Sequence, residues 1–148
     1  MAKSFSSLKE LERYLNKQIQ NTLQNEVFAE VKDTMQKKID KDVYEAYTPY
    51  STDGVTPHYQ RTGKLRESIE KSLNGNTLIV ENTRSENGRD IVEVIESGKG
   101  YTWGYSRNLN EEIGSRPFVE STKNELRNSN KLEQAMKKGL KKQGLSIE

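Results

Sequence analysis

One stretch decides the fold, residues 6–47, with the sequence SSLKELERYLNKQIQNTLQNEVFAEVKDTMQKKIDKDVYEAY. It contains neither Pro nor Gly, and Ser7 precedes Glu10 by three residues, the spacing of a capping box at a helix start. Apolar residues recur at every fourth position, namely Leu11, Leu15, Ile19, Leu23, Val27, Val31, Met35, Ile39 and Val43. This pattern predicts a long N-terminal helix over residues 6–47.

The spacing of this stripe differs from the 3.6-residue turn of a straight α-helix. Each four-residue step over-rotates by roughly 40°, so the stripe winds most of the way around the helix. Either the helix breaks near Asn21–Asn25, or its two ends bury against different neighbours. An unbroken helix would be about 60 Å long, whereas a compact globule of this size is only about 40 Å across. A continuous helix would therefore overhang its domain and dock on another subunit; the alternative is two shorter helices packed within one chain.

The rest of the chain divides into a loop over residues 48–61, a β-rich core over 62–105 and a C-terminal helical segment over 117–143. Turn signals at Asn74-Gly75-Asn76 and Asn87-Gly88 separate the predicted strands Ser68–Leu73, Thr77–Thr83 and Ile91–Glu96, and Tyr101–Tyr105 is a fourth candidate. We predict an α+β fold in a single domain, residues 1–148. An antiparallel meander of three to four strands would pack against the long N-terminal helix and the C-terminal helical segment.

Composition excludes several classes of function. The 148 residues are 31% hydrophobic and 31% charged, with no cysteine and only His58 as histidine. Mean hydropathy is −0.98. Disulfides and zinc-thiolate sites are excluded, and one histidine leaves little for a histidine metal site or a Ser-His-Asp triad. Gly63-Lys64 lacks the flanking residues of a phosphate loop. We expect an intracellular protein that is not an enzyme, spans no membrane and needs neither cofactor nor metal.

Two groups of side chains are candidates for partner binding. Lys137, Lys138, Lys141 and Lys142 cluster near the C-terminus, where they either contact DNA or an acidic protein surface, or form a solvated helix end. Tyr101, Trp103 and Tyr105 stand among glycines, as a small satellite core or as interface anchors.

Several short motifs occur in a characteristic order. Thr62-Gly63-Lys64-Leu65-Arg66-Glu67-Ser68-Ile69 follows the long helix, Val94-Ile95-Glu96-Ser97-Gly98 follows the paired strands, and Arg116-Pro117-Phe118-Val119 opens the last helix. From about Ile39 to Leu126 the chain resembles the tail-component family of long-tailed bacteriophages whose type member is gene product ten of phage HK-ninety-seven.

The resemblance implies a virion structural protein of the neck or tail junction, a tail-completion or head–tail joining component assembled in the bacterial cytoplasm. Its partners would be further copies of itself in a ring, and connector, neck or tail-tube proteins. Thr62 and Gly63 would start a short helix, Leu65 and Ile69 would be buried, Arg116 would pair with an acidic partner, and Phe118 would anchor the last helix on the sheet. Two alternatives remain: a nucleic-acid-binding protein that uses the basic C-terminal helix, and a small metal-dependent hydrolase that uses acidic residues.

Overall fold

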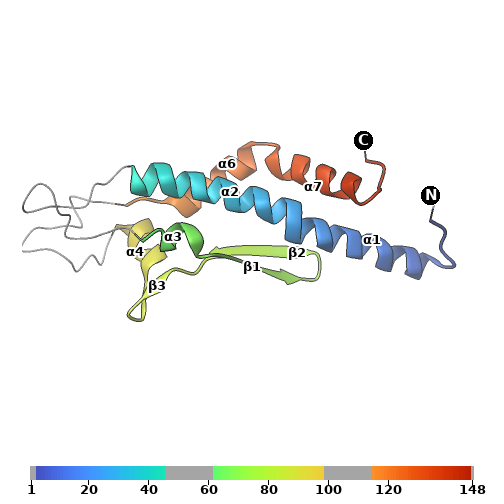
Figure 1. Cartoon of the computed structure of the whole chain (residues 1–148), viewed down its shortest axis with the longest axis horizontal. Helices are drawn as coiled ribbons and strands as arrows, with labels where there is room; N and C mark the ends of the chain where they lie inside the picture. The colour runs from blue at the N-terminus through green and yellow to red at the C-terminus, as the bar shows by residue number, and fades with distance from the viewer. Residues whose placement is uncertain (1–2, 46–61, 99–114, 148) are drawn as a thin grey trace, which may run out of the picture.

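The fold is built along one helix that runs from Leu8 to Tyr44 (Figure 1). The computed structural model describes residues 3–45, 62–98 and 115–147. Ser7 caps the helix, because its hydroxyl accepts a hydrogen bond from the backbone N–H of Glu10. The Glu10 carboxylate in turn accepts a hydrogen bond from the N–H of Ser6. The helical conformation continues without a gap from Leu8 to Tyr44, so the predicted helix is continuous and the alternative of two separate helices is wrong.

The helix changes its winding twice. α1 (Leu8–Thr22) passes into a π-helical segment, η1 (Leu23–Val27); α2 (Phe28–Lys38) follows and ends in a second π-helical segment, η2 (Ile39–Tyr44). A π turn holds about 4.4 residues, so each segment turns the four-residue repeat back by roughly 70°. The apolar residues from Leu23 to Val43 then stay on a face about 120° wide, against about 200° on an uninterrupted α-helix. The helix accommodates the four-residue spacing by widening, and the alternative of a break near Asn21–Asn25 is wrong.

The two halves of the helix bury against different neighbours, which is the second of the two alternatives that the sequence left open. Met35, Ile39 and Val43 share one core with four buried residues from later in the chain: Leu65, Ile69, Ile95 and Phe118, of which Phe118 is fully buried. Leu23 and Val27 share a second core with Ala135, and with the half-buried side chains of Leu73 and Leu78. The first turns of α1 extend past both neighbours (Figure 1), and Leu8 is 85% exposed there.

The predicted first hairpin is present. β1 (Ile69–Asn74) pairs antiparallel with β2 (Thr77–Asn82), and Asn74 lies opposite Thr77. Gly75 takes a φ of +58° in the turn, a conformation that disfavours side chains. Asn76 fixes the tip of the hairpin on α1, since its amide donates to Asn16 Oδ1 over 3.1 Å.

The second predicted hairpin is wrong in its last strand. Asn87 and Gly88 do form a turn with positive φ at both positions, but it joins the short strands β3 (Ser85–Glu86) and β4 (Arg89–Asp90). The predicted strand over Ile91–Glu96 is instead helix α4 (Ile91–Ser97). The described strands thus form two separate two-stranded sheets and no meander. The candidate strand Tyr101–Tyr105 lies outside the described residues.

Capping explains why residues 91–97 form a helix. The carboxylate of Asp90 accepts a hydrogen bond from the N–H of Glu93 over 3.1 Å, which satisfies a donor of the first turn. Gly98, with a φ of +71°, ends the helix. Ile95 projects from α4 into the first core, so tertiary packing supports the same choice.

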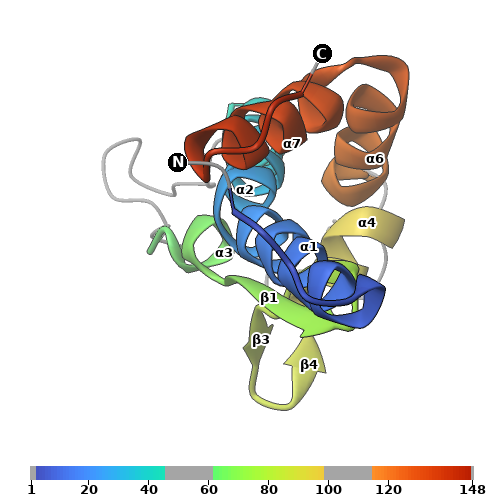
Figure 2. The same ribbon diagram turned by 90° about the vertical axis from the view of Figure 1, so that its right-hand side faces the viewer.

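The C-terminal helices follow the prediction closely. α6 (Phe118–Asn128) packs along α2, and α7 (Lys131–Lys142) packs along η1 and α1. The two are separated at Ser129 and Asn130, and the chain returns toward the end of the molecule where α1 begins (Figure 1). Viewed along the long axis, α6 and α7 lie on one side of the long helix and the β1–β2 hairpin on the other (Figure 2). The α+β class is confirmed.

Candidate interaction surfaces

The structure joins the two motifs that lie on either side of residues 99–114. Glu96, in the first motif, accepts a hydrogen bond from the N–H of Val119 over 2.5 Å and so caps the start of α6. The N–H of Arg116 donates to the carbonyl of Ile95 over 2.9 Å, and the Ser115 hydroxyl donates to the carbonyl of Glu96. The segments Val94–Gly98 and Arg116–Val119 are therefore one structural unit.

Glu96 is half-buried, and its carboxylate has a perturbed acidity. Burial raises the pKa of Glu96, because it removes water from the ionised form. Hydrogen bonds from the backbone N–H groups of Val119 and Glu120 act in the opposite direction and are the smaller effect. The sequence indicates no role for Glu96, because its partner Val119 lies far along the chain, beyond residues 99–114.

The remaining motif residues fall into a core group and a surface group. Leu65, Ile69 and Phe118 are buried in the same core, as predicted for the two aliphatic residues. Phe118 fastens α6 to this core, which includes Ile69 of β1 and Ile39 of the long helix. Gly63 takes a φ of +76° immediately before α3 (Lys64–Glu67), so it forms the predicted turn, while Thr62 is exposed.

Arg116 and the aromatic cluster complete the predicted sites. The Arg116 guanidinium donates to the backbone carbonyl of Val43 over 3.4 Å, which ties the start of α6 to the end of the long helix. Tyr101, Trp103, Tyr105 and His58 lie outside the described residues, so the structure does not test their predicted roles.

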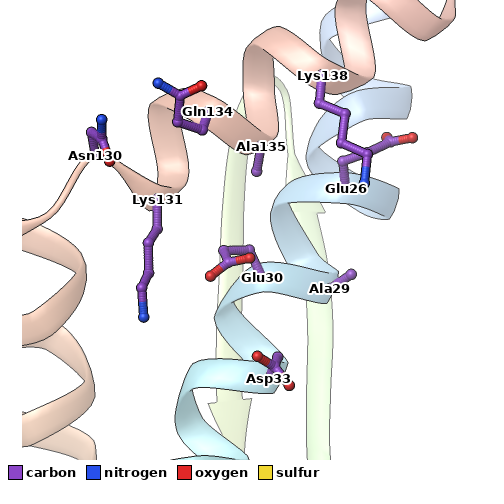
Figure 3. Close-up of a pocket in the computed structure, with 9 residues that line it drawn as sticks. All are labelled: Glu26, Ala29, Glu30, Asp33, Asn130, Lys131, Gln134, Ala135 and Lys138. Atoms are coloured by element: carbon purple, nitrogen blue, oxygen red, sulfur yellow. The ribbon is translucent and has the colours of Figure 1, made fainter.

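A shallow groove lies between the long helix and α7 (Figure 3). Its volume is about 400 Å³, and Ala29 and Ala135 are among the residues that line it. Carboxylates of Glu26, Glu30 and Asp33 project from the long helix, and Lys131 and Lys138 project from α7. Two of these carboxylates already form ion pairs within the chain. Lys142 Nζ lies 3.7 Å from Glu26 Oε1, and Lys37 Nζ lies 2.8 Å from Asp33 Oδ2. Nowhere in residues 3–45, 62–98 and 115–147 do three or more metal-binding side chains gather as a metal site would need.

The predicted lysine cluster lies on α7. Lys137 pairs with Glu133 over 2.8 Å, one turn away on the same helix. Lys138 and Lys141 are exposed, and neither forms an ion pair within the described part of the chain. The exposed face of α7 therefore carries two lysines without an ion-pair partner among the described residues, of which Lys138 projects over the groove toward the long helix (Figure 3).

Among the described residues, no helix combines the length and the apolar character needed to cross a bilayer.

Comparison with known proteins places the chain in a family. A family model described as YomN matches residues 7–142. A relative from Bacillus subtilis (strain 168), described as an SPbeta prophage-derived uncharacterized protein YomN, is 35% identical over 116 residues. The match covers 78% of this chain and 76% of the relative. No solved structure matches the chain. From the match over nearly its whole length, the chain belongs to the YomN family.

Proposed function

We propose that this protein is a bacteriophage structural protein of the neck or tail junction, acting as a tail-completion or head–tail joining component. It acts by assembly and not by catalysis, as a ring of identical subunits in the virion, and it is assembled in the host cytoplasm. Its other partners are connector, neck or tail-tube proteins. The phage assignment is supported by the relative from the SPbeta prophage.

The observation that carries the finer proposal is the joining of the motifs that resemble the tail-component family. Leu65, Ile69 and Phe118 meet in one core, and Glu96 caps the helix opened by Arg116-Pro117-Phe118-Val119. Segments distant in sequence thus cooperate as parts of a single scaffold. An assembly role is also supported by the exposed first turns of α1, which leave Leu8 and Leu15 in contact with solvent.

The deciding experiment removes the gene from an inducible phage that carries it. Electron microscopy of the lysate should show DNA-filled heads and separate tails, and a plasmid copy of the gene should restore complete particles. Labelled antibody against the protein should mark the head–tail junction of complete virions. Normal infectious particles from the deletion strain would refute the proposal.

Nucleic-acid binding is the second candidate, and the observation that favours it is the basic face of α7. Lys138 and Lys141 have no carboxylate partner among the described residues, so they are available to contact phosphates. This candidate predicts that the protein binds duplex DNA with an affinity that falls steeply as salt increases. An absent or salt-independent response would remove it.

A further inference from the structure

The charge of the described residues is unevenly distributed across the long helix. Residues 115–147 carry eight Lys and Arg against three Asp and Glu, a net charge of +5. Residues 62–98 carry five basic against seven acidic residues, a net charge of −2, and residues 3–45 carry eight of each. In both views the α6–α7 pair and the β1–β2 hairpin lie on opposite sides of the long helix (Figures 1 and 2). Two of the seven acidic residues in 62–98, Glu93 and Glu96, belong to α4, where Glu96 caps the start of α6. The described residues therefore present a basic side on α6 and α7, and on the opposite side the hairpin carries Glu70 and Glu81.

Both acidic residues of the β1–β2 hairpin lie on its outer face. Lys71, Leu73 and Val80 point toward the helices: Lys71 Nζ donates to the Gln24 carbonyl over 2.6 Å, and the other two pack against the cores. Because side chains alternate along a strand, Glu70 and Glu81 point the other way.

Glu70 and Glu81 are direct cross-strand partners, an arrangement that is unfavourable for two like charges. Neither carboxylate forms an ion pair with any residue that the structure describes, and both are exposed. Ile79 lies beside Glu81 on the same face and is 41% exposed. The outer hairpin face thus combines two uncompensated anions with an apolar side chain.

The basic side offers a matching arrangement. Lys138 and Lys141 are three residues apart on α7, so their Cβ atoms are about 5–6 Å apart. Directly opposed residues on paired strands have Cβ atoms about 4.5–5.5 Å apart. Two lysines at this spacing can therefore face two glutamates at nearly the same spacing, and the lysine stems can cover Ile79.

We propose that a second copy of this chain places the basic face of α7 (Lys138 and Lys141) on the outer hairpin face (Glu70, Ile79 and Glu81). The inference rests on the proposed ring assembly and names the surfaces that form it. The contact is heterologous, because a different face of each copy takes part, and both faces stay available on every copy. Such a contact repeats from subunit to subunit, closing into a ring or continuing as a filament.

The test uses charge reversal on each face of the full-length protein. Variants K138E/K141E and E70K/E81K are compared with wild type by sedimentation velocity over a range of concentrations and salt. Each variant should self-associate about tenfold more weakly or worse, because like charges then meet at the contact. The two variants mixed in equal amounts should associate again, since each then supplies the face that the other needs. Wild-type association should weaken as salt increases.

Two controls make the result specific. K9E/K17E makes the same change of charge on exposed residues of α1 and should leave association within about twofold of wild type. Circular dichroism of each variant establishes that it is folded, and the mixing experiment excludes misfolding because two unfolded chains would not restore assembly.

Three results would overturn the inference. A wild-type protein that stays monomeric at every concentration excludes the contact, yet the proposed neck function survives if gene deletion still separates heads from tails. Association that is unchanged in both charge variants shows that copies meet through other surfaces. Loss of duplex DNA binding in K138E/K141E with unchanged self-association assigns the basic face to nucleic acid instead.

Discussion

Replacing Gly139 with alanine should destabilise the protein, although alanine is the better helix former. A Cβ atom at residue 139 of α7 would lie 2.4 Å from Thr22 Cγ2 and 2.8 Å from Glu26 Oε2. Carbon atoms in contact are normally about 3.5–4.0 Å apart, so α7 must move away by more than about 1 Å. Thr22 cannot easily yield, because it is fully buried and its hydroxyl accepts a hydrogen bond from Gln143 over 2.5 Å.

The expected magnitude follows from two opposing effects. Exchanging glycine for alanine in a helix favours folding by about 1 kcal/mol. Overpacking a tight contact costs about 1–3 kcal/mol, and movement of α7 also loosens Ala135 and its neighbours in the second core. We expect a net loss of about 1–2 kcal/mol in the free energy of unfolding, or a melting temperature lower by about 3–8 °C.

A double-mutant cycle tests the cause. Thr22→Ser removes the Cγ2 methyl and keeps the hydroxyl that accepts from Gln143, at a cost of about 1 kcal/mol. In the Thr22→Ser/Gly139→Ala protein the closest clash is gone, so the two changes should couple favourably by at least about 1 kcal/mol. Urea unfolding followed by circular dichroism measures all four proteins, with Gln134→Ala as a control on the exposed side of α7. A Gly139→Ala protein as stable as wild type, with no coupling to Thr22, would refute the close packing of α7 on the long helix.

Three further predictions test other parts of the fold. Glu96→Ala should cost about 1 kcal/mol by removing the cap on Val119, and Glu96→Gln should keep most of that stability because its amide oxygen still accepts. Burial raises the pKa of Glu96 above the ordinary glutamate pKa of about 4.3. Wild type should therefore lose stability relative to Glu96→Gln as pH rises from that ordinary value through the raised pKa. A difference in melting temperature between the two proteins that stays constant across this pH window would contradict the assignment. Deleting Asn25 should convert η1 to an α-turn. The lost residue removes about 100° of rotation and the lost wide turn restores roughly 70°, so α1 should rotate by only about 30° on α2 and the protein should still melt cooperatively; an unfolded deletion protein would contradict the π-helical turn. Thr34→Val should stabilise the protein by about 1 kcal/mol in urea unfolding, because the buried Thr34 hydroxyl has no hydrogen-bond partner among the described residues. A loss of stability would show that the hydroxyl does form a hydrogen bond.

The candidate surfaces were only partly predictable. Lys138 and Lys141 stand out in the sequence because they lie in a dense run of lysines, and the structure places them on an exposed helix face. Glu70 and Glu81 do not stand out, because nothing in a linear sequence shows that they face each other across two strands. The role of Glu96 was equally hidden, since its partner Val119 lies beyond a segment of about twenty residues.

The sequence by itself was sufficient where residues close together in the chain specify the local structure. The capping residues before Leu8 and an apolar repeat free of Pro and Gly determine the long helix, and Asn74-Gly75-Asn76 determines the first hairpin. Tertiary structure decided the conformation of segments in which the local sequence favours strand and helix about equally. A short apolar run such as residues 91–96 suits strand or helix alike, and its burial against Phe118 together with the Asp90 cap selected the helix. Packing also decided the π-helical turns. A π turn is less favourable than an α turn by itself, and burial of the apolar residues 23–43 on one face of the helix offsets that cost.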